Sequence, residues 1–87
     1  MEGTRVALLG IVVENPDSVE PLNRLLHRHQ DAIIGRMGLP YRQRGVCIIS
    51  IVLDAPGDEI SSLAGQVGML PGVTARAVYS KMPEGSS

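Results

Sequence analysis

The sequence predicts an α+β fold in which four strands and two helices follow one another in the order βαββαβ. Three observations lead to this prediction. First, the chain looks like a duplication, because IVVENPDS at 11–18 parallels IVLDAPGD at 51–58. Second, each copy combines an apolar strand, an acidic residue and proline in a turn, an amphipathic segment and a second strand. Third, this order of elements is typical of an antiparallel sheet with both helices on one face.

In the first copy, the strand RVALLGIVV covers 5–13 and is ended by Pro16 and Asp17. We expect a helix capped by Asp17 or Ser18, because Pro21 is tolerated only in the first turn, where a backbone N–H is not needed. The helix carries an apolar stripe at helical spacing, made of Val19, Leu22, Leu25, Leu26 and His29.

The remaining elements follow from propensity and turn residues. Residues 33–40 predict a weak strand, and its two glycines and final proline place it at a sheet edge. YRQRG at 41–45 predicts a turn, and VCIISIVLD at 46–54 predicts a strong β-branched strand. A second helix is expected at about 58–69, followed by the last strand at 73–80. The apolar face of this second helix consists of Ile60, Leu63, Ala64 and Val67. The expected strand order is 4-1-3-2, a ferredoxin-like architecture.

Length and composition limit the possible classes of protein. The chain has 87 residues, which predicts one domain at 1–81 and a flexible tail at 82–87. Its net charge of −1 argues against direct binding to nucleic acid or an acidic membrane. The single cysteine, Cys47, cannot form an internal disulfide, which fits a reducing compartment. No secretion signal and no stretch of ~20 apolar residues is visible, so we expect a cytoplasmic protein.

Both faces of the central strands are apolar, although a sheet with helices on one face normally carries polar residues on the other. The strand at 46–54 has two sets, Val46, Ile48, Ser50 and Val52 on one face, and Cys47, Ile49, Ile51 and Leu53 on the other. Monomers rarely expose large contiguous apolar patches. We therefore expect the uncovered face to pack against another copy in a dimer or tetramer, and we assign the set beginning at Cys47 to that interface.

Basic residues gather in the first half of the chain, at Arg24, Arg28, Arg36, Arg42 and Arg44. Arginines and a proline on an edge strand would prevent it from pairing with other chains. The alternative is a binding site at a subunit junction, in which Arg36 and Arg42, beside Tyr41, grip a carboxylate or phosphate. Gly35 and Gly38 would then permit close approach of the backbone. A phosphate loop is not indicated, since such a loop joins a strand to a helix.

Residues 31–81, DAIIGRMGLPYRQRGVCIISIVLDAPGDEISSLAGQVGMLPGVTARAVYSK, resemble the small proteins known as iron-only hydrogenase system regulators. The run IIGRMGLPYR followed by ISIVLDAP carries the resemblance, which extends back through LLHRHQD and the first strand. That family is similar to ACT-like domains and to the C-terminal, metal-binding domain of nickel-responsive repressors. The resemblance implies an ACT-like fold and a regulatory role linked to iron-only hydrogenase genes.

The similarity to the nickel-binding domain implies a ligand set that this chain matches only in part. His27 and Cys47 fall on two of the four ligand positions, whereas Leu39 and Tyr41 occupy the other two and are poor nickel ligands. The alternatives to metal binding are structural roles, with His27 as a cation near a helix end and Cys47 as a small apolar residue. The DNA-binding ribbon-helix-helix has no counterpart, so any regulation of transcription would require a partner.

These observations favour a homo-oligomeric, ACT-like regulatory or ligand-sensing module that is not an enzyme. The expected ligand is a small anion or an amino-acid-like molecule, and the residues identify no cofactor. Two alternatives remain open: a structural protein–protein interaction module without a ligand, and a metal-binding protein that uses His27 and Cys47. Asp54, Asp58 and Glu59 indicate a helix start and not a catalytic pair.

Overall fold

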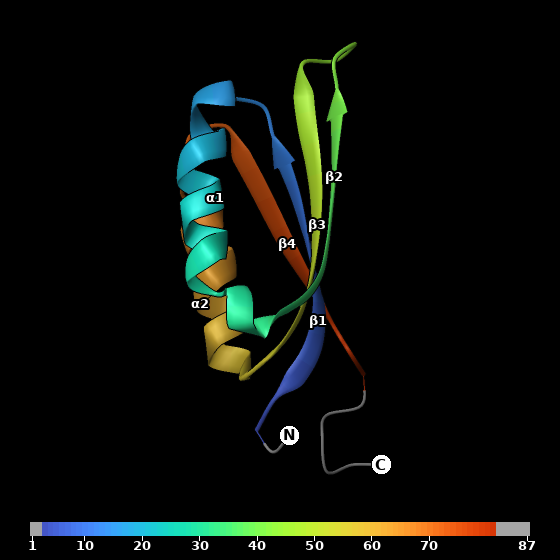
Figure 1. Ribbon diagram of the computed structural model, residues 1–87, viewed down its shortest axis with the longest axis vertical. Helices are drawn as coiled ribbons and strands as arrows, with labels where there is room; N and C mark the ends of the chain where they lie inside the picture. The colour runs from blue at the N-terminus through green and yellow to red at the C-terminus, as the bar shows by residue number, and fades with distance from the viewer. Residues whose placement is uncertain (1–2, 82–87) are drawn as a thin grey trace.

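The computed structural model describes residues 3–81 as one four-stranded antiparallel sheet with two helices on one face (Figure 1). The strands are β1 (Arg5–Val13), β2 (Ile33–Tyr41), β3 (Val46–Ala55) and β4 (Val73–Tyr79), and the helices are α1 (Val19–Arg28) and α2 (Gly57–Gly68). Short 3-10 turns, Pro16–Ser18 and Gln30–Ala32, flank α1. The predicted α+β, ferredoxin-like fold is confirmed. The tail expected at 82–87 lies outside the described residues.

The sheet has the order β2-β3-β1-β4, which is the predicted order, with β2 at one edge and β4 at the other. β1 pairs with β3 in an unbroken register in which Leu9 lies opposite Ile51. β2 contains a bulge: Ile33 lies opposite Leu53, but Gly35 lies opposite Val52. Because the bulge inserts one residue, every side chain after it is on the opposite face from the one that regular alternation would give.

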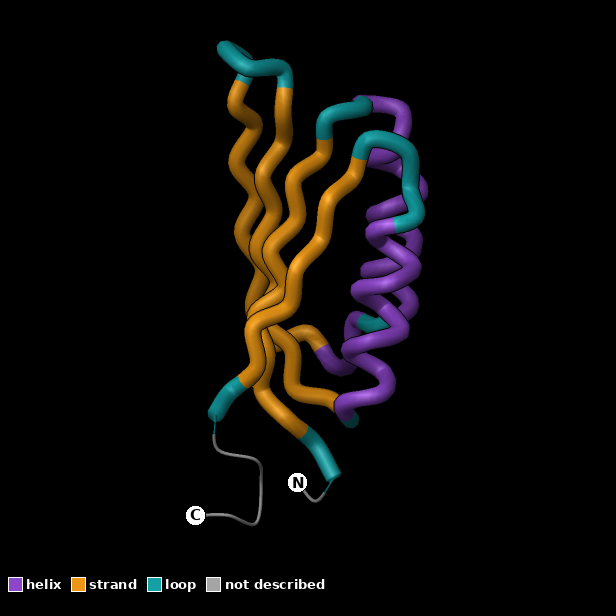
Figure 2. Tube along the Cα trace, turned by 180° about the vertical axis from the view of Figure 1, so that it is seen from behind, coloured by secondary structure: helices purple, strands orange, loops and turns teal. Residues whose placement is uncertain are grey.

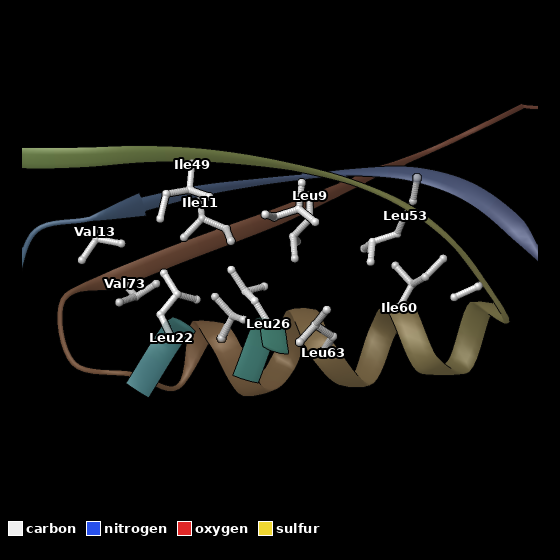
Figure 3. Close-up of a cluster of buried hydrophobic side chains, with 14 residues drawn as sticks. Leu9, Ile11, Val13, Leu22, Leu26, Ile49, Leu53, Ile60, Leu63 and Val73 are labelled. Carbon is white, nitrogen blue, oxygen red and sulfur yellow. The ribbon is translucent and has the colours of Figure 1, made fainter. Parts of the chain in front are cut away.

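The core fills the space between the sheet and the helices (Figure 3). It is aliphatic, and its fully buried large side chains are Leu9, Ile11, Leu22, Leu26, Ile51, Leu53, Ile60, Leu63 and Val67. Ile49, Ile51 and Leu53 are therefore core residues with at most 4% of their surface exposed. The assignment of these three residues to an intersubunit interface was wrong. They lie on the helix-covered face, together with the half-buried Cys47.

The start of α1 differs from the prediction. Ser18 precedes α1, but its hydroxyl donates a hydrogen bond to the Pro71 carbonyl at 2.6 Å and does not cap the helix. The capping side chain is Asn15, whose Oδ1 accepts from the backbone N–H of Asp17 at 3.0 Å. A 3-10 turn thus starts the helical segment, and the buried Ser18 instead ties α1 to the loop before β4.

That loop depends on Gly72, whose φ of +68° is in the left-handed region. A Cβ at this position would lie 2.8 Å from Asn15 Cβ and 3.0 Å from Asn15 N. The Gly72 carbonyl also accepts the Glu14 N–H at 2.7 Å, so the two loops meet closely at this point. Replacement of Gly72 therefore combines backbone strain with a steric clash.

We expect Gly72→Ala to lower the free energy of unfolding by at least ~1 kcal/mol more than Gly45→Ala does. Gly45 is the matched control, because its φ is +66° but a Cβ there would meet nothing within 4 Å. Urea denaturation followed by circular dichroism measures both changes. Equal losses for the two variants would show that the contact with Asn15 costs nothing.

Candidate functional site

The face of the sheet away from the helices is the first candidate site. Figure 2 shows no helix or loop of residues 3–81 covering it. Its exposed apolar side chains, which we name the apolar outer face, are Val6, Leu8, Val12, Met37, Leu39, Ile48 and Val78. They are between 38% and 64% exposed and come from all four strands. A contiguous exposed patch of this kind marks an interaction surface more often than a bare monomer surface.

The register places these side chains next to one another across the sheet. Val12 lies opposite Ile48, and Ile48 lies opposite Leu39. Leu8 lies opposite Val78 on its other side. Because opposite residues in antiparallel strands share a face, the seven side chains belong to one surface.

A few positions interrupt the apolar outer face. Gly10 at its centre carries no side chain and lies opposite Ser50 on one side and Arg76 on the other. A Cβ at Gly10 would meet only the Arg76 carbonyl oxygen, at 3.9 Å. The centre of the apolar outer face therefore lacks a protruding side chain. On the β4 side the face carries polar groups such as Arg76, as the rim of a protein interface commonly does.

The second candidate is a cavity of about 370 Å³ beside the β2–β3 turn, which we name the hairpin cavity. It is lined by Val13, Pro16, Val19, Pro40, Tyr41, Arg42, Gly45, Val46 and Cys47. Its walls thus come from the end of β1, the start of the α1 segment and the turn of the hairpin. Two backbone hydrogen bonds close that turn, from Arg44 N to Tyr41 O and from Gly45 N to Arg42 O, both at 3.2 Å.

A third candidate is a cavity of about 390 Å³ between α1 and β2. It is lined by Asn23, Leu26, His27, Gln30, Ile33 and Arg36. Arg36 reaches this side of the sheet because the bulge turns it toward α1, where its Nη2 donates to Asn23 Oδ1 at 2.7 Å. The cavity is more polar than the hairpin cavity, but its one arginine is already hydrogen-bonded.

The five residues predicted to form one ligand site lie in different places. Arg42 and Tyr41 line the hairpin cavity, whereas Arg36 lines the cavity between α1 and β2. Gly35 and Gly38 line neither of these cavities; Gly35 instead faces Val52 at the bulge. A single chain therefore does not bring the predicted set together.

The two predicted metal ligands also lie apart. Cys47 lines the hairpin cavity with Val19 from the start of α1, whereas His27 is near the end of that helix, about 12 Å along its axis. In the part of the chain that the structure describes, no group of three or more His, Cys, Asp or Glu residues could hold a metal ion. His29 is engaged elsewhere, since its Nδ1 is 2.8 Å from Glu59 Oε2 and links the end of α1 to the first turn of α2.

Sequence reasoning predicted an uncovered apolar face but assigned the wrong set of β3 residues to it, although a signal for the right set was present. On β3 the exposed set contains Ser50, and on β1 it contains Gly10, whereas the sets that face the helices, apart from Arg5 at the start of β1, contain only Ala, Cys, Val, Ile and Leu. The set with the polar or missing side chain is the one that faces away from the core. No signal of this kind pointed to Val13, Pro16 and Val19 as walls of a cavity.

Within residues 3–81, the structure contains no helix that is both long enough and apolar enough to cross a bilayer. The longest helix, α2, has 12 residues.

Comparisons with known proteins identify relatives of the chain. A family model described as "TM1266-like: Iron-only hydrogenase system regulator, putative" matches residues 5–77. The structure of the protein TM1266 from Thermotoga maritima is similar, with 34% identity, a TM-score of 0.86, and coverage of 90% of this chain and 99% of that one. No curated protein sequence matches the chain.

Two further structures share only the fold. The C-terminal domain of the MgtC protein from Mycobacterium tuberculosis has 12% identity and a TM-score of 0.71, with coverage of 98% of this chain and 97% of that one. A formyltetrahydrofolate deformylase from Pseudomonas putida KT2440 has 14% identity and a TM-score of 0.64, with coverage of 88% of this chain but 29% of that one.

Proposed function

The chain belongs to the TM1266-like family of iron-only hydrogenase system regulators, and from this premise we propose that it is a homo-oligomeric, ACT-like regulatory module that senses a small ligand. It acts without catalysis and contacts a partner protein in the cytoplasm, where its one thiol stays reduced. The apolar outer face is the observation that carries the proposal, because a face of this kind is suited to a second copy of the chain.

The size of the outer face supports self-association. Strands of about nine residues at ~3.3 Å per residue, spaced ~4.8 Å apart, give a four-stranded face of roughly 600 Å². Protruding side chains add to this figure, so the face is comparable with the ~800 Å² per partner of a standard interface. At ~25 cal/mol per Å² of apolar area, covering it contributes several kcal/mol or more to association.

Light scattering after size exclusion tests the assembly. We expect a mass of twice the 9.3 kDa of one chain, or a higher multiple, at tens of micromolar. Dilution should convert this species to single chains, since association follows mass action. A 9.3 kDa species throughout the concentration series would overturn the proposed homo-oligomer.

The regulatory role needs a test of its own in the host. Deletion of the gene should change the level of hydrogenase transcripts or hydrogen production, and the wild-type gene should restore it. Because the net charge of −1 does not favour nucleic acid, purified protein alone should not shift hydrogenase promoter DNA. Unchanged transcripts and unchanged hydrogen production in the deletion strain would contradict the regulatory role.

A further inference from the structure

The hairpin cavity has apolar walls that are held in place. Pro16 and Pro40 each have a fixed φ, and Val13 belongs to a paired position at the end of β1. Val19 is the first residue of α1. Walls that need not be ordered on binding reduce the entropic cost of holding a ligand.

The hairpin cavity is lined by one charged residue. Arg42 lines it from the β2–β3 turn, and none of the residues that line the cavity is acidic. Among residues 3–81, no ion pair or side-chain hydrogen bond satisfies Arg42, whereas Arg24 is paired with Glu20 and Arg36 with Asn23. An unneutralised guanidinium beside apolar walls is complementary to an anion with an apolar body.

The volume narrows the class of ligand further. A cavity of about 370 Å³ is near the lower end of the ~300–1,000 Å³ typical of small-molecule sites, which favours a metabolite over a dinucleotide cofactor. A single arginine suits the two oxygens of a carboxylate, whereas a phosphate has more oxygens to satisfy than this cavity has cationic groups.

We propose that the hairpin cavity binds a small carboxylic acid with a branched or ring-shaped apolar body. The carboxylate is held by the Arg42 guanidinium, and the apolar body lies against Val13, Val19 and the two prolines, beside the Cys47 thiol. This inference supplies the ligand class for the proposed sensing role and rests on it.

The binding test uses 4-methylpentanoate as the probe, titrated into ¹⁵N-labelled full-length protein and followed by NMR. We expect saturable shifts of the amides around the cavity, including Val19 and Cys47. The neutral 4-methylpentanamide and the short acetate ion should each bind at least ~10-fold more weakly, because each lacks one half of the recognised chemistry. If the amide binds as well as the acid, Arg42 is not a carboxylate receptor and the proposal fails.

Arg42→Gln should weaken binding of 4-methylpentanoate at least ~10-fold, the effect of losing one charge-assisted hydrogen-bonding group. Arg44→Gln is the matched control, because Arg44 is in the same exposed turn and has the same charge but does not line the cavity. Arg44→Gln should change the affinity less than ~3-fold. Equal effects of the two variants would reduce the role of Arg42 to general surface charge and would overturn the proposal.

Cys47 gives a second readout, since it is the only cysteine and lines the cavity half-buried. Saturating 4-methylpentanoate should slow alkylation of Cys47 by iodoacetamide severalfold in wild type and in Arg44→Gln. In Arg42→Gln, the same probe concentration should give little protection. Unchanged alkylation in probe-saturated wild type would place the bound acid elsewhere.

These experiments separate this inference from the proposed function. The hairpin cavity lies within one chain, so the probe can bind whether or not the apolar outer face associates. If a chain that stays monomeric binds the probe, only the proposed homo-oligomer is contradicted. If a multimer regulates hydrogenase genes but does not bind 4-methylpentanoate, only the ligand assignment is contradicted.

Discussion

Replacing Leu9 by alanine is expected to lower the free energy of unfolding by about 2–5 kcal/mol, because the change leaves a cavity in the centre of the core. Leu9 is 0% exposed and lies in β1 opposite Ile51 and Ala77. The fully buried part of the core is aliphatic and contains no aromatic ring that could move into the vacated space. Domains of this size have free energies of unfolding of ~5–15 kcal/mol. Urea denaturation should therefore show that Leu9→Ala loses a large fraction of the stability of the wild type.

Leu8→Ala is the matched control, because it makes the same chemical change one residue away on the opposite face. Leu8 is 44% exposed and belongs to the apolar outer face. The loss caused by Leu9→Ala should not depend on protein concentration, whereas any loss caused by Leu8→Ala should shrink on dilution, as subunits separate. Two equal, concentration-independent losses would contradict the assignment of the two faces.

The order and approximate position of the elements were predictable because the duplication repeats them. α1 ends at Arg28 and α2 at Gly68, while β2 begins at Ile33 and β4 at Val73, so both pairs are forty residues apart. Hydrophobic period and turn residues are local properties, and a repeat shows each of them twice. The strand order then follows from the few topologies that place two helices on one face.

The direction of individual side chains was not predictable to the same degree. Regular alternation from Ile33 would turn Arg36 away from the helices, but the bulge at Ile34 reverses this and sends Arg36 to Asn23. One extra residue moves every later side chain of β2 to the opposite face of the sheet. Residues 33–40 contain two glycines, and a bulge is possible at either of them. For this reason the sequence could suggest that Arg36 and Arg42 act together, although the fold separates them.

The hairpin cavity was beyond sequence reasoning for a different reason. Its walls join Val13 and Val19 to Pro40 and Cys47, residues that are distant in the chain and individually unremarkable in type. Only the tertiary fold, which brings the start of the α1 segment and the β2–β3 turn to one cavity, makes them neighbours. Arg42 was identified beforehand because a charge in a turn is visible in sequence, whereas the apolar half of the site depends on tertiary packing.

The second large effect is expected from Leu8→Glu, which should convert the assembly to single chains. In a two-fold symmetric contact, both copies present the same residue, so the substitution brings two carboxylates into one apolar interface. An unpaired buried charge costs ~3–5 kcal/mol, which corresponds to a dissociation constant raised at least ~100-fold. Light scattering at tens of micromolar should then give one 9.3 kDa chain, and circular dichroism should still show a folded protein, since Leu8 is half-exposed in the single chain.

Met69→Glu is the control for this experiment, because it makes a comparable change at an exposed apolar residue on the helix layer. Met69 follows α2, is 84% exposed and lies near Pro21 and Leu25 of α1. It should leave the mass and the dissociation constant unchanged. The opposite result, with Met69→Glu monomeric and Leu8→Glu still assembled, would move the interface to the helices and leave the apolar outer face free for a different protein. Because both variants add one negative charge, net charge cannot explain a difference between them, and only the position of the contact can.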